Sequence, residues 1–382
     1  MDFELAEDIR LMRSHVRDFA QAEIAPIASL LDKHPEFPWK SLRKMGEMGL
    51  LGMLTPERYG GSGLDTLTYV VMLEEISAAD ASHGTIMSVT NGLPQSMILD
   101  YGTDAQKNKY LPKLASGEWI GSFCLSEPHC GSDAVAMKTR AEKVEGGYKV
   151  SGTKAWITSG SEAQVYLVMA KTDPQAGARG VSCFIVEKGS KGMIFGKPEE
   201  KLGQHAAITT TVIFDDCFIA EEQLLGKEGQ GFVYAMTSLD SGRIGIAAQA
   251  LGIARAAFET ARDYADERQA FGKPIRENQG ISFKLADIAT QLEAARLLTY
   301  KAAWLKDRGY RVTQEASMAK LFASEASAKI THAAIQILGG YGYSKDYPVE
   351  RYFRDARVTE IYEGTSEIQR VVISRQIYRD LA

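Results

Sequence analysis

One short segment, IYEGTSEIQR (361–370), combines a carboxylate with residues that typically begin a helix. A Gly-Thr pair breaks the pattern directly after Glu363, so a turn is predicted there. An amphipathic helix should follow, with Thr365 or Ser366 as its cap and Glu367 in its first turn. A helix N-terminus can dock an anionic ligand, and a carboxylate beside it can act as a general base. From this segment alone, a solvated loop residue explains Glu363 equally well.

Two further segments contain residues that suit a flat polar ligand. LSEPHCGSD (125–133) follows a short predicted strand, and its small residues would let backbone and serine side chains approach a ligand closely. An ordinary loop of a β-domain is the alternative. TKAWITSG (153–160) ends a strand with Trp156 and Thr158 one pleat apart, so both should point to the same face. An aromatic ring with a hydroxyl donor suits an isoalloxazine ring, although a core tryptophan is the more common explanation.

Hydrophobic periodicity predicts helices at both ends of the chain. Near the N-terminus, apolar residues recur at helical spacing over residues 9–19, and the glycine-rich stretch 56–65 should be a loop. After about residue 228, two long alanine-rich stripes cover residues 285–305 and 319–337. The second stripe ends at Gly339, a typical C-terminal stop. Long alanine-rich stripes favour close packing in a helical bundle.

Between these helical regions the period changes to that of short strands, separated by Gly, Pro and Asp clusters. The predicted strands are 120–126, 148–158, 165–172, 181–189 and 209–219. Several short strands at regular intervals indicate a compact β-domain of barrel or sandwich type. We therefore predict an α+β fold with three parts. These are an N-terminal helical domain (1–118), a central β-domain (119–227) and a C-terminal helical bundle domain (228–382).

The overall composition is typical of a globular protein. The 382 residues are 45% apolar and 24% charged, with a net charge of −5. This balance offers no basic footprint for nucleic acid and no polybasic membrane anchor. No apolar run approaches the roughly 20 residues that span a bilayer. The charged amphipathic start at Met1 does not resemble a signal peptide, so we expect a cytoplasmic protein, with a matured organellar protein as the alternative.

The four cysteines are Cys124, Cys130, Cys183 and Cys217. They form no CxxC pair, and none has a histidine at metal-ligand spacing. A disulfide framework is therefore not expected, and no metal site is predicted. Buried thiols in a reducing compartment are the simpler interpretation.

Six motifs, in order, resemble the acyl-CoA dehydrogenase family over essentially the whole chain, nearest to its short-chain, butyryl-CoA branch. They are LSEPHCGSD (125–133), WIT (156–158), LDSGRIGIAAQALGIA (239–254), ERQAFGKPI (267–275), QILGGYGY (336–343) and IYEGTSEIQR (361–370). The resemblance implies a C-terminal four-helix bundle, with FAD between it and the β-domain. It also implies a homotetramer that passes electrons to an electron-transfer flavoprotein. No GxGxxG follows a strand, so a nicotinamide site of Rossmann type has no support.

The resemblance assigns roles to residues at matching positions, with Glu363 as the catalytic base. The positions implied to bind FAD are Phe123, Cys124, Leu125, Ser126, Gly131, Ser132, Trp156, Ile157, Thr158, Phe271, Thr365, Ser366 and Glu367. Those implied to reach FAD across a subunit interface are Arg268, Gln279, Gln336, Ile337, Leu338, Gly339 and Gly340. Those implied to contact the acyl-CoA substrate are Ser132, Asp240, Ser241, Gly242, Arg243 and Gly364.

In the implied reaction, Glu363 removes the α-proton while the β-hydrogen leaves as hydride to flavin N5, and the product is a trans-2-enoyl-CoA. The thioester carbonyl would accept hydrogen bonds from the Glu363 backbone N–H and a ribityl hydroxyl, which stabilise the developing enolate. A substrate that excludes water should raise the carboxylate's pKa. Some family members carry the base at the position matching Gly242, and glycine there leaves Glu363 without a competitor.

The acyl group and the function class keep alternatives open. His129 and Cys130 replace the small pair usual before the glycine of this loop, and Pro94 is unusual in SVTNGLPQSM (88–97), which matches a wall of the acyl pocket. A straight short chain, a branched chain and a small ring all remain open. An acyl-CoA oxidase is a rival, although that family is usually much longer. A non-catalytic flavoprotein scaffold is the other, opposed by the intact YEGT around Glu363.

Overall fold

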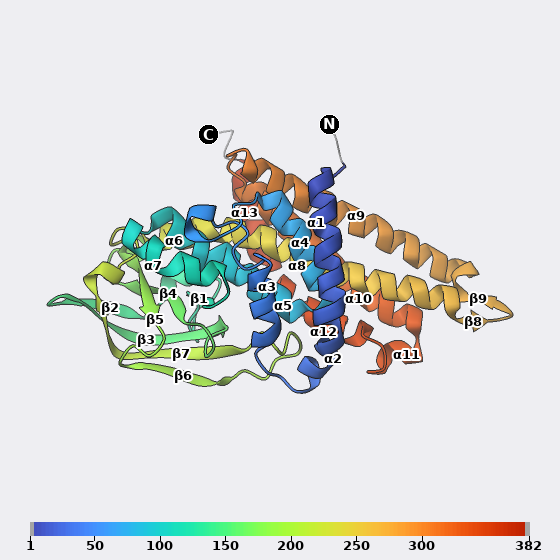
Figure 1. The fold of residues 1–382 in the computed structure, drawn as a ribbon, viewed down its shortest axis with the longest axis horizontal. Coiled ribbons are helices and arrows are strands. Elements are labelled where there is room, and N and C mark those ends of the chain that lie inside the picture. The colour runs from blue at the N-terminus through green and yellow to red at the C-terminus, as the bar shows by residue number, and fades with distance from the viewer. Residues whose placement is uncertain (1–3, 379–382) are drawn as a thin grey trace.

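The computed structural model describes residues 4–378 and begins with a helical domain (Figure 1). Its helices are α1 (Glu7–Phe19), α2 (Ala25–Lys33), α3 (Trp39–Glu47), α4 (Thr66–Ala79), α5 (Ala81–Thr90), α6 (Ser96–Tyr101) and α7 (Asp104–Ala115). α4 and α5 are buried on nearly every side because they pack against the C-terminal helices as well as their own domain. The predicted loop 56–65 contains only a short 3-10 turn.

The central domain is a seven-stranded sheet. Its strands are β1 (Gly121–Cys124), β2 (Arg140–Val144), β3 (Gly147–Thr158), β4 (Val165–Lys171), β5 (Val181–Glu187), β6 (Met193–Pro198) and β7 (Thr209–Ala220). β4 pairs with β1 in parallel and with β5 antiparallel, while β3, β7 and β6 form an antiparallel set with β2. The two sets meet where Arg140 pairs with Lys171. The charged strand β2 and the half-exposed strand β6 were not among the predicted strands, because neither has a buried apolar run.

The C-terminal domain is built on three long helices, α8 (Gly231–Glu267), α9 (Gln279–Asp307) and α10 (Thr313–Leu338). A small hairpin of β8 (Gln269–Ala270) and β9 (Lys273–Pro274) joins α8 to α9 at the far end of the molecule (Figure 1). The shorter helices are α11 (Gly340–Tyr343), α12 (Val349–Arg357) and α13 (Ser366–Ile377), all of which contact α10. The predicted order of helical, β and helical domains is confirmed.

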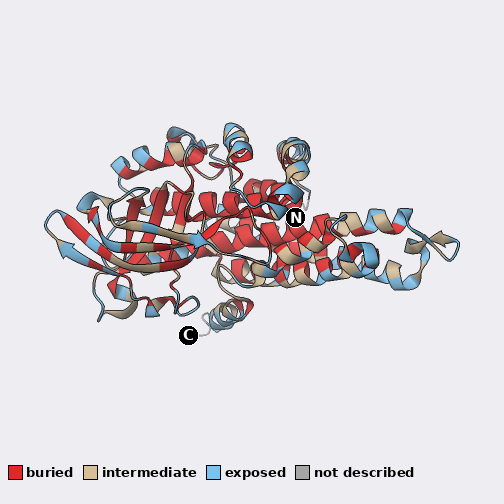
Figure 2. Ribbon diagram, turned by 90° about the horizontal axis from the view of Figure 1, so that it is seen from below, coloured by how far each residue is buried: buried red, intermediate tan, exposed pale blue. Residues whose placement is uncertain are grey.

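Burial is concentrated where the three domains meet, and the far half of the long helices is more exposed (Figure 2). The middle of α8 is continuously buried from Gly242 to Ala257, because α4 and α10 cover it. Glycine permits this approach: a Cβ added at Gly252 would lie 2.5 Å from the carbonyl oxygen of Glu74 on α4. The small residues of the alanine-rich stripes thus bring helix backbones together, as the pattern predicted.

A buried network of charges fixes the N-terminal domain to the bundle. Glu74 and Glu75 of α4 form ion pairs with Arg255 of α8 at 2.9 Å and 2.6 Å. Arg17 of α1 reaches the Glu75 carboxylate at 2.9 Å, and Arg296 of α9 reaches that of Glu74 at 3.2 Å. Burial alone would raise the pKa of Glu75, but the hydrogen bond from Arg17 and the charge of Arg255 hold it below its usual value.

Pro94 lies in a π-helical turn (Asn91–Gln95) that joins α5 to α6. A π-turn accommodates the missing N–H of proline without ending the helix. A Cβ added at Gly121, the first residue of β1, would lie 2.7 Å from the Cβ of Pro94. Packing between this helix and the β-domain therefore accounts for the proline. Among residues 4–378, no helix combines the length and the apolar character required to cross a bilayer.

Candidate active site

Glu363 lies in a tight turn between a 3-10 turn (Val358–Glu360) and α13. The backbone is left-handed at both Glu363 and Gly364, with φ angles of 50° and 93°. Thr365 caps α13, since its Oγ1 accepts a hydrogen bond from the N–H of Ile368 at 3.3 Å. A non-glycine residue in this conformation costs about 1–3 kcal/mol, so surrounding contacts must hold the turn in place.

The Glu363 carboxylate faces α8 and α10. A Cβ added at Gly242 of α8 would overlap its Oε2 atom. Oε2 is buried and has no hydrogen-bond partner in the described chain. Burial raises the pKa of Glu363 to about 7, although the charges of Lys320 and Arg243 oppose this rise. The carboxylate therefore titrates near neutral pH, the range in which a general base is most effective.

The segment 240–243 of α8 forms a polar network beside this carboxylate. Arg243 pairs with Asp240 at 2.7 Å, and the Thr313 hydroxyl donates to the other oxygen of Asp240 at 2.6 Å. On the next residue, the Ser241 hydroxyl accepts from Lys306 Nζ at 2.7 Å. Burial raises the pKa of Asp240. The positions predicted to contact acyl-CoA on α8 and at Gly364 are thus gathered around Glu363, because Gly242 touches its carboxylate.

Two buried hydroxyls border the same face of α8. Tyr69 OH on α4 and Ser88 Oγ on α5 have no hydrogen-bond partner among the described residues. A Cβ added at Gly245, one turn after Gly242, would lie 2.6 Å from Ser88 Oγ and 3.4 Å from Tyr69 OH. The two hydroxyls lie close enough to influence each other, and no further partner is found for either among the described residues.

The loop 125–133 is held by a buried ion pair. Lys154 of β3 is fully buried, and its Nζ contacts Glu127 Oε1 at 2.8 Å and the carbonyl of Leu125 at 3.1 Å. The same carboxylate accepts two backbone N–H groups, from Lys138 at 2.7 Å and Thr139 at 3.0 Å. Glu127 therefore ties the start of the loop to Lys154 of β3 and to the segment that leads into β2.

The predicted cofactor residues of this region differ in exposure. Gly131 and Ser132 are exposed in the loop, and a Cβ added at Gly131 would meet nothing within 4 Å. Cys124 is fully buried and Leu125 nearly so, and burial raises the pKa of Cys124 to about 12. The side chains of these two residues pack in the core, so only their backbone can face a ligand. Phe123 and Ser126 are half-buried.

Glu127, His129 and Cys130 place three possible metal-ligand atoms within 4.8 Å of one another. The Glu127 carboxylate is already neutralised by Lys154 and accepts backbone donors, so it offers little to a cation. His129 Nε2 lies 3.1 Å from the carbonyl of Ala136 and 3.7 Å from Glu127. The histidine thus closes the loop onto the following turn, which gives the unusual His-Cys pair a packing role.

Trp156 presents its ring at the surface, with 63% of the residue exposed, while the next residue, Ile157, is buried. Thr158 is half-buried, so Trp156 and Thr158 are both more exposed than the residue between them. The structure adds a feature that the alternation did not indicate. The backbone at Trp156 is left-handed (φ 62°), and the pairing of β3 with β7 shifts register there. This β-bulge turns the indole outward.

The residues predicted to reach FAD across an interface lie elsewhere. Arg268 caps the end of α8, Phe271 lies in the hairpin that follows, and Gln279 begins α9. Residues 336–340 span the end of α10 and the start of α11. Figure 1 shows this end of the bundle far from the β-domain that carries Trp156. Phe271 is 96% exposed. Within one chain, therefore, the structure does not bring these residues to the same place as Trp156.

The residues near Glu363 and on the β-domain fit a flavin nucleotide. The exposed indole of Trp156 offers an aromatic surface, and the open backbone at Gly131 permits close approach. At the N-terminus of α13, Ser366 Oγ is buried without a hydrogen-bond partner in the described chain. The segments 123–132, 156–158 and 365–367 would hold the cofactor.

One other polar cluster does not form a second active site. Ser41, His83 and Asp80 are linked by hydrogen bonds of 2.7 Å each, the order found in serine hydrolases. All three are buried, and Ser41 donates to the carbonyl of Pro38, so this is a structural network.

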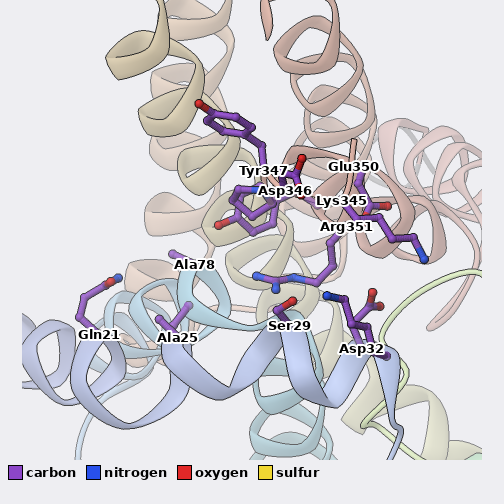
Figure 3. A pocket seen from close by; sticks show the side chains of 14 residues that line it. Gln21, Ala25, Ser29, Asp32, Ala78, Lys345, Asp346, Tyr347, Glu350 and Arg351 are labelled. Carbon is purple, nitrogen blue, oxygen red and sulfur yellow. The ribbon is translucent and has the colours of Figure 1, made fainter. Parts of the chain in front are cut away.

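A pocket of about 260 Å³ lies between α2 and the start of α12 (Figure 3). None of the predicted site residues lines it. Two of its carboxylates, Asp32 and Glu350, are both paired with Arg354 at 2.7 Å. These two carboxylates share one arginine, and the pocket contains none of the residues predicted to act on a substrate or cofactor.

Sequence reasoning did not identify several residues that shape the site. Lys320 donates to the carbonyl of Gly364 at 2.8 Å, and Tyr69 borders the carboxylate from α4. The pair of Glu127 and Lys154 that anchors the loop was missed as well. A lysine in the buried stripe of α10 was a visible signal for the first of these. The others depend on contacts between distant segments.

Models of the acyl-CoA dehydrogenase family match nearly the whole chain: the N-terminal domain over residues 6–118, the middle domain over 122–217 and the C-terminal domain over 229–378. An acyl-CoA dehydrogenase of Bacillus subtilis (strain 168) is 54% identical over 96% of this chain and 97% of its own. The mitochondrial short-chain specific acyl-CoA dehydrogenase of Rattus norvegicus is 52% identical over 98% and 91%. The solved structure of butyryl-CoA dehydrogenase from Megasphaera elsdenii is 42% identical, covers 99% of this chain and 100% of its own, and has a TM-score of 0.97.

A carboxylate held among α4, α8 and α10, in a chain with these matches, defines a flavin-dependent dehydrogenase. The chain belongs to the acyl-CoA dehydrogenase family. The predictions of the fold, of an acyl-CoA dehydrogenase and of FAD as the cofactor are confirmed.

Proposed function

We propose that this enzyme oxidises a short-chain acyl-CoA to the 2-enoyl-CoA, with Glu363 as the base that takes the α-proton. The observation that carries the proposal is the Glu363 carboxylate, which is buried against Gly242, lacks a partner for Oε2 in the described chain and has a pKa of about 7. A carboxylate in this state can take a proton from a weak carbon acid held beside it. FAD, when bound, supplies the acceptor for the β-hydride.

The turn that carries Glu363 also provides a donor for the substrate. Among residues 4–378, no group accepts a hydrogen bond from the backbone N–H of Glu363. This N–H is therefore free to donate to the thioester carbonyl. A donor placed where negative charge develops stabilises the enolate. The charges of Arg243 and Lys320 also act on the Glu363 carboxylate. Exclusion of water by the acyl chain would further favour proton transfer at Glu363 by desolvating the carboxylate.

The test is Glu363→Gln, followed by anaerobic stopped-flow reduction with butyryl-CoA. The amide keeps the size of the side chain but cannot accept the proton. We expect substrate to bind and perturb the flavin spectrum while reduction slows by at least the roughly 10²–10⁴-fold attributed to a general base. Reduction at close to the parental rate would show that Glu363 is not the base.

The acyl group is proposed to have about four to six carbons, with room for modest branching or a ring. The supporting observation is the likeness to short-chain specific relatives and to a butyryl-CoA dehydrogenase. Each methylene that fits should add roughly 0.8 kcal/mol to binding, and one that clashes should reverse the trend. A panel of straight, branched and cyclic acyl-CoA thioesters measures this directly. Best activity on a chain of about twelve carbons would contradict it.

We also propose a homotetramer that delivers electrons to an electron-transfer flavoprotein. The hairpin residue Phe271 and the bundle residues Phe283 and Tyr343 are 96%, 62% and 89% exposed, which favours contact with further copies of the chain. The predicted cofactor residues at this end would then complete the FAD site of a neighbour. A flavin-loaded monomer in light scattering would contradict the tetramer. Rapid turnover with oxygen alone would favour an oxidase instead.

A further inference from the structure

Lys320 is a buried cation in the bundle, beside the turn that carries Glu363. It is fully buried on α10, and its Nζ donates to the carbonyl of Gly364 at 2.8 Å. Within residues 4–378 no carboxylate forms an ion pair with it. Burial lowers the pKa of Lys320 to about 8, so the amine is still mostly protonated at neutral pH. A buried charge without an ion pair is costly. The group that Lys320 contacts belongs to the turn that carries Glu363, so a role in that turn would explain the lysine.

The carbonyl that Lys320 contacts has a second donor. Gln369 of α13 is also fully buried, and its Nε2 donates to the carbonyl of Gly364 at 2.8 Å and to that of Glu363 at 3.2 Å. Lys320 and Gln369 therefore hold the left-handed turn at residues 363 and 364 from two different helices. They differ in one respect, because only the lysine adds a charge.

Few charged or titratable groups face the Glu363 carboxylate. Lys320 approaches from α10 and Arg243 from α8, and both oppose the rise in its pKa. Tyr69 of α4 and Tyr362 of the same turn also lie close, and burial raises the pKa of both phenols, which stay neutral. Arg243 already forms an ion pair with Asp240 at 2.7 Å. Lys320 is thus the cation beside the base that has no ion-pair partner in the described chain.

Three other charged groups face Lys320 itself. Arg243 lowers its pKa, while Glu367 and Glu325 raise it in addition to Glu363. Glu367 is exposed at the start of α13, and Glu325 pairs with Arg370 at 2.7 Å. Neither of these carboxylates contacts the amine, so the lysine's charge is directed mainly at the turn.

We propose that Lys320 is a positioning residue for Glu363, which fixes the turn through Gly364 and sets the pH at which the base works. The inference rests on the function proposed above, in which Glu363 is the base. Without the lysine's charge, burial would act on the carboxylate with less opposition, and its pKa would rise. The base would then be protonated over a wider range of neutral pH. Without the hydrogen bond, the turn would lose one of its two anchors.

The experiment is the pH dependence of anaerobic flavin reduction by butyryl-CoA in the FAD-loaded enzyme. Lys320→Gln keeps a donor for Gly364 but removes the charge, and Gln369→Met removes a donor but no charge. We expect the midpoint of the pH profile to move upward by about one pH unit or more in Lys320→Gln. In Gln369→Met the midpoint should stay in place while the maximal rate falls. Lys320→Arg keeps the charge and should keep the parental midpoint.

An unchanged midpoint in Lys320→Gln would overturn the proposal, and so would an equal shift in Gln369→Met. If Lys320→Gln does not fold, Lys320→Arg decides: a parental midpoint with slower reduction supports the role, and an upward shift contradicts it. The variant Glu363→Gln distinguishes a failure of the proposed function from a failure of the proposed role of Lys320. Loss of reduction in that variant with no midpoint shift in Lys320→Gln would leave the proposed function intact and remove only the role of Lys320.

Discussion

Gly242 of α8 and Glu363 of the turn before α13 share one position in space: the Oε2 atom of the glutamate occupies the place that a side chain at residue 242 would take. The two residues are separated by most of the C-terminal domain in sequence. Because the Glu363 carboxylate lies against Gly242, residue 242 cannot carry a side chain without displacing it. A carboxylate at Glu363 and a side chain at residue 242 of α8 therefore cannot occupy this position together.

Gly242→Ala should therefore displace the carboxylate. A methyl group at this position meets Oε2 and forces the Glu363 side chain to another rotamer. Misplacement of a reacting group by about 1 Å can cost roughly 10²-fold in rate, and we expect flavin reduction by butyryl-CoA to fall to that degree. Gly245→Ala is the comparison on the same face. Its methyl group meets the rotatable Ser88 hydroxyl at 2.6 Å, so the loss should be smaller.

Glu363→Gln should stabilise the folded protein above neutral pH. The folded-state pKa of about 7 lies above the ordinary value of 4.5, so the folded state binds the proton more tightly than the unfolded state. Stability of the parental enzyme should thus fall as pH rises from about 4.5 to 7, and the charged carboxylate then costs up to about 3 kcal/mol. Removal of this cost should raise Tm at about pH 8 and change it little near pH 4.5. Thermal unfolding of the FAD-loaded proteins at both pH values checks the sign.

Arg268→Ala should weaken FAD binding without disrupting the fold. The guanidinium lies 5.9 Å from the centre of the Tyr341 ring, and no carboxylate pairs with it among the described residues. If Arg268 contacts the cofactor of a neighbour, its loss removes about 1.5–3 kcal/mol, a drop in affinity of roughly tenfold to a hundredfold. Titration of apoprotein with FAD measures this. Arg262→Ala, which removes an exposed arginine paired with Asp263 at 2.7 Å, should bind FAD as the parent does.

Lys154→Met should destabilise the β-domain and loosen the loop 125–133. The substitution leaves the Glu127 carboxylate buried without its counter-charge, and breaking a buried pair in this way costs about 3–5 kcal/mol. Lys149→Met on the same strand breaks only an exposed pair with Asp216 and should lower the stability much less. Chemical denaturation compares the two variants. Equal stability would show that the Glu127–Lys154 pair does not anchor the loop.

Features with a local cause were predicted from the sequence. The spacing of apolar residues gave α1, α9 and α10, and the stop at Gly339 is the end of α10, where the backbone has φ 61°. The turn at Glu363 and the cap at Thr365 were predicted correctly because a cap is formed by neighbouring residues. The apolar strands were found, whereas β2 and β6 were missed because partner strands, and not their own composition, hold them in the sheet.

The electrostatics of the site were decided only by the tertiary structure. The sequence determined by itself that a carboxylate would stand in a turn before a helix, and its motifs identified the family. It did not show that Gly242 meets this carboxylate, that Lys320 holds the turn, or that Tyr69 borders it. These contacts join α4, α8 and α10, which are far apart in the chain. Burial raises the pKa of Glu363 to about 7 only after those helices have packed around it, and no local pattern encodes that packing.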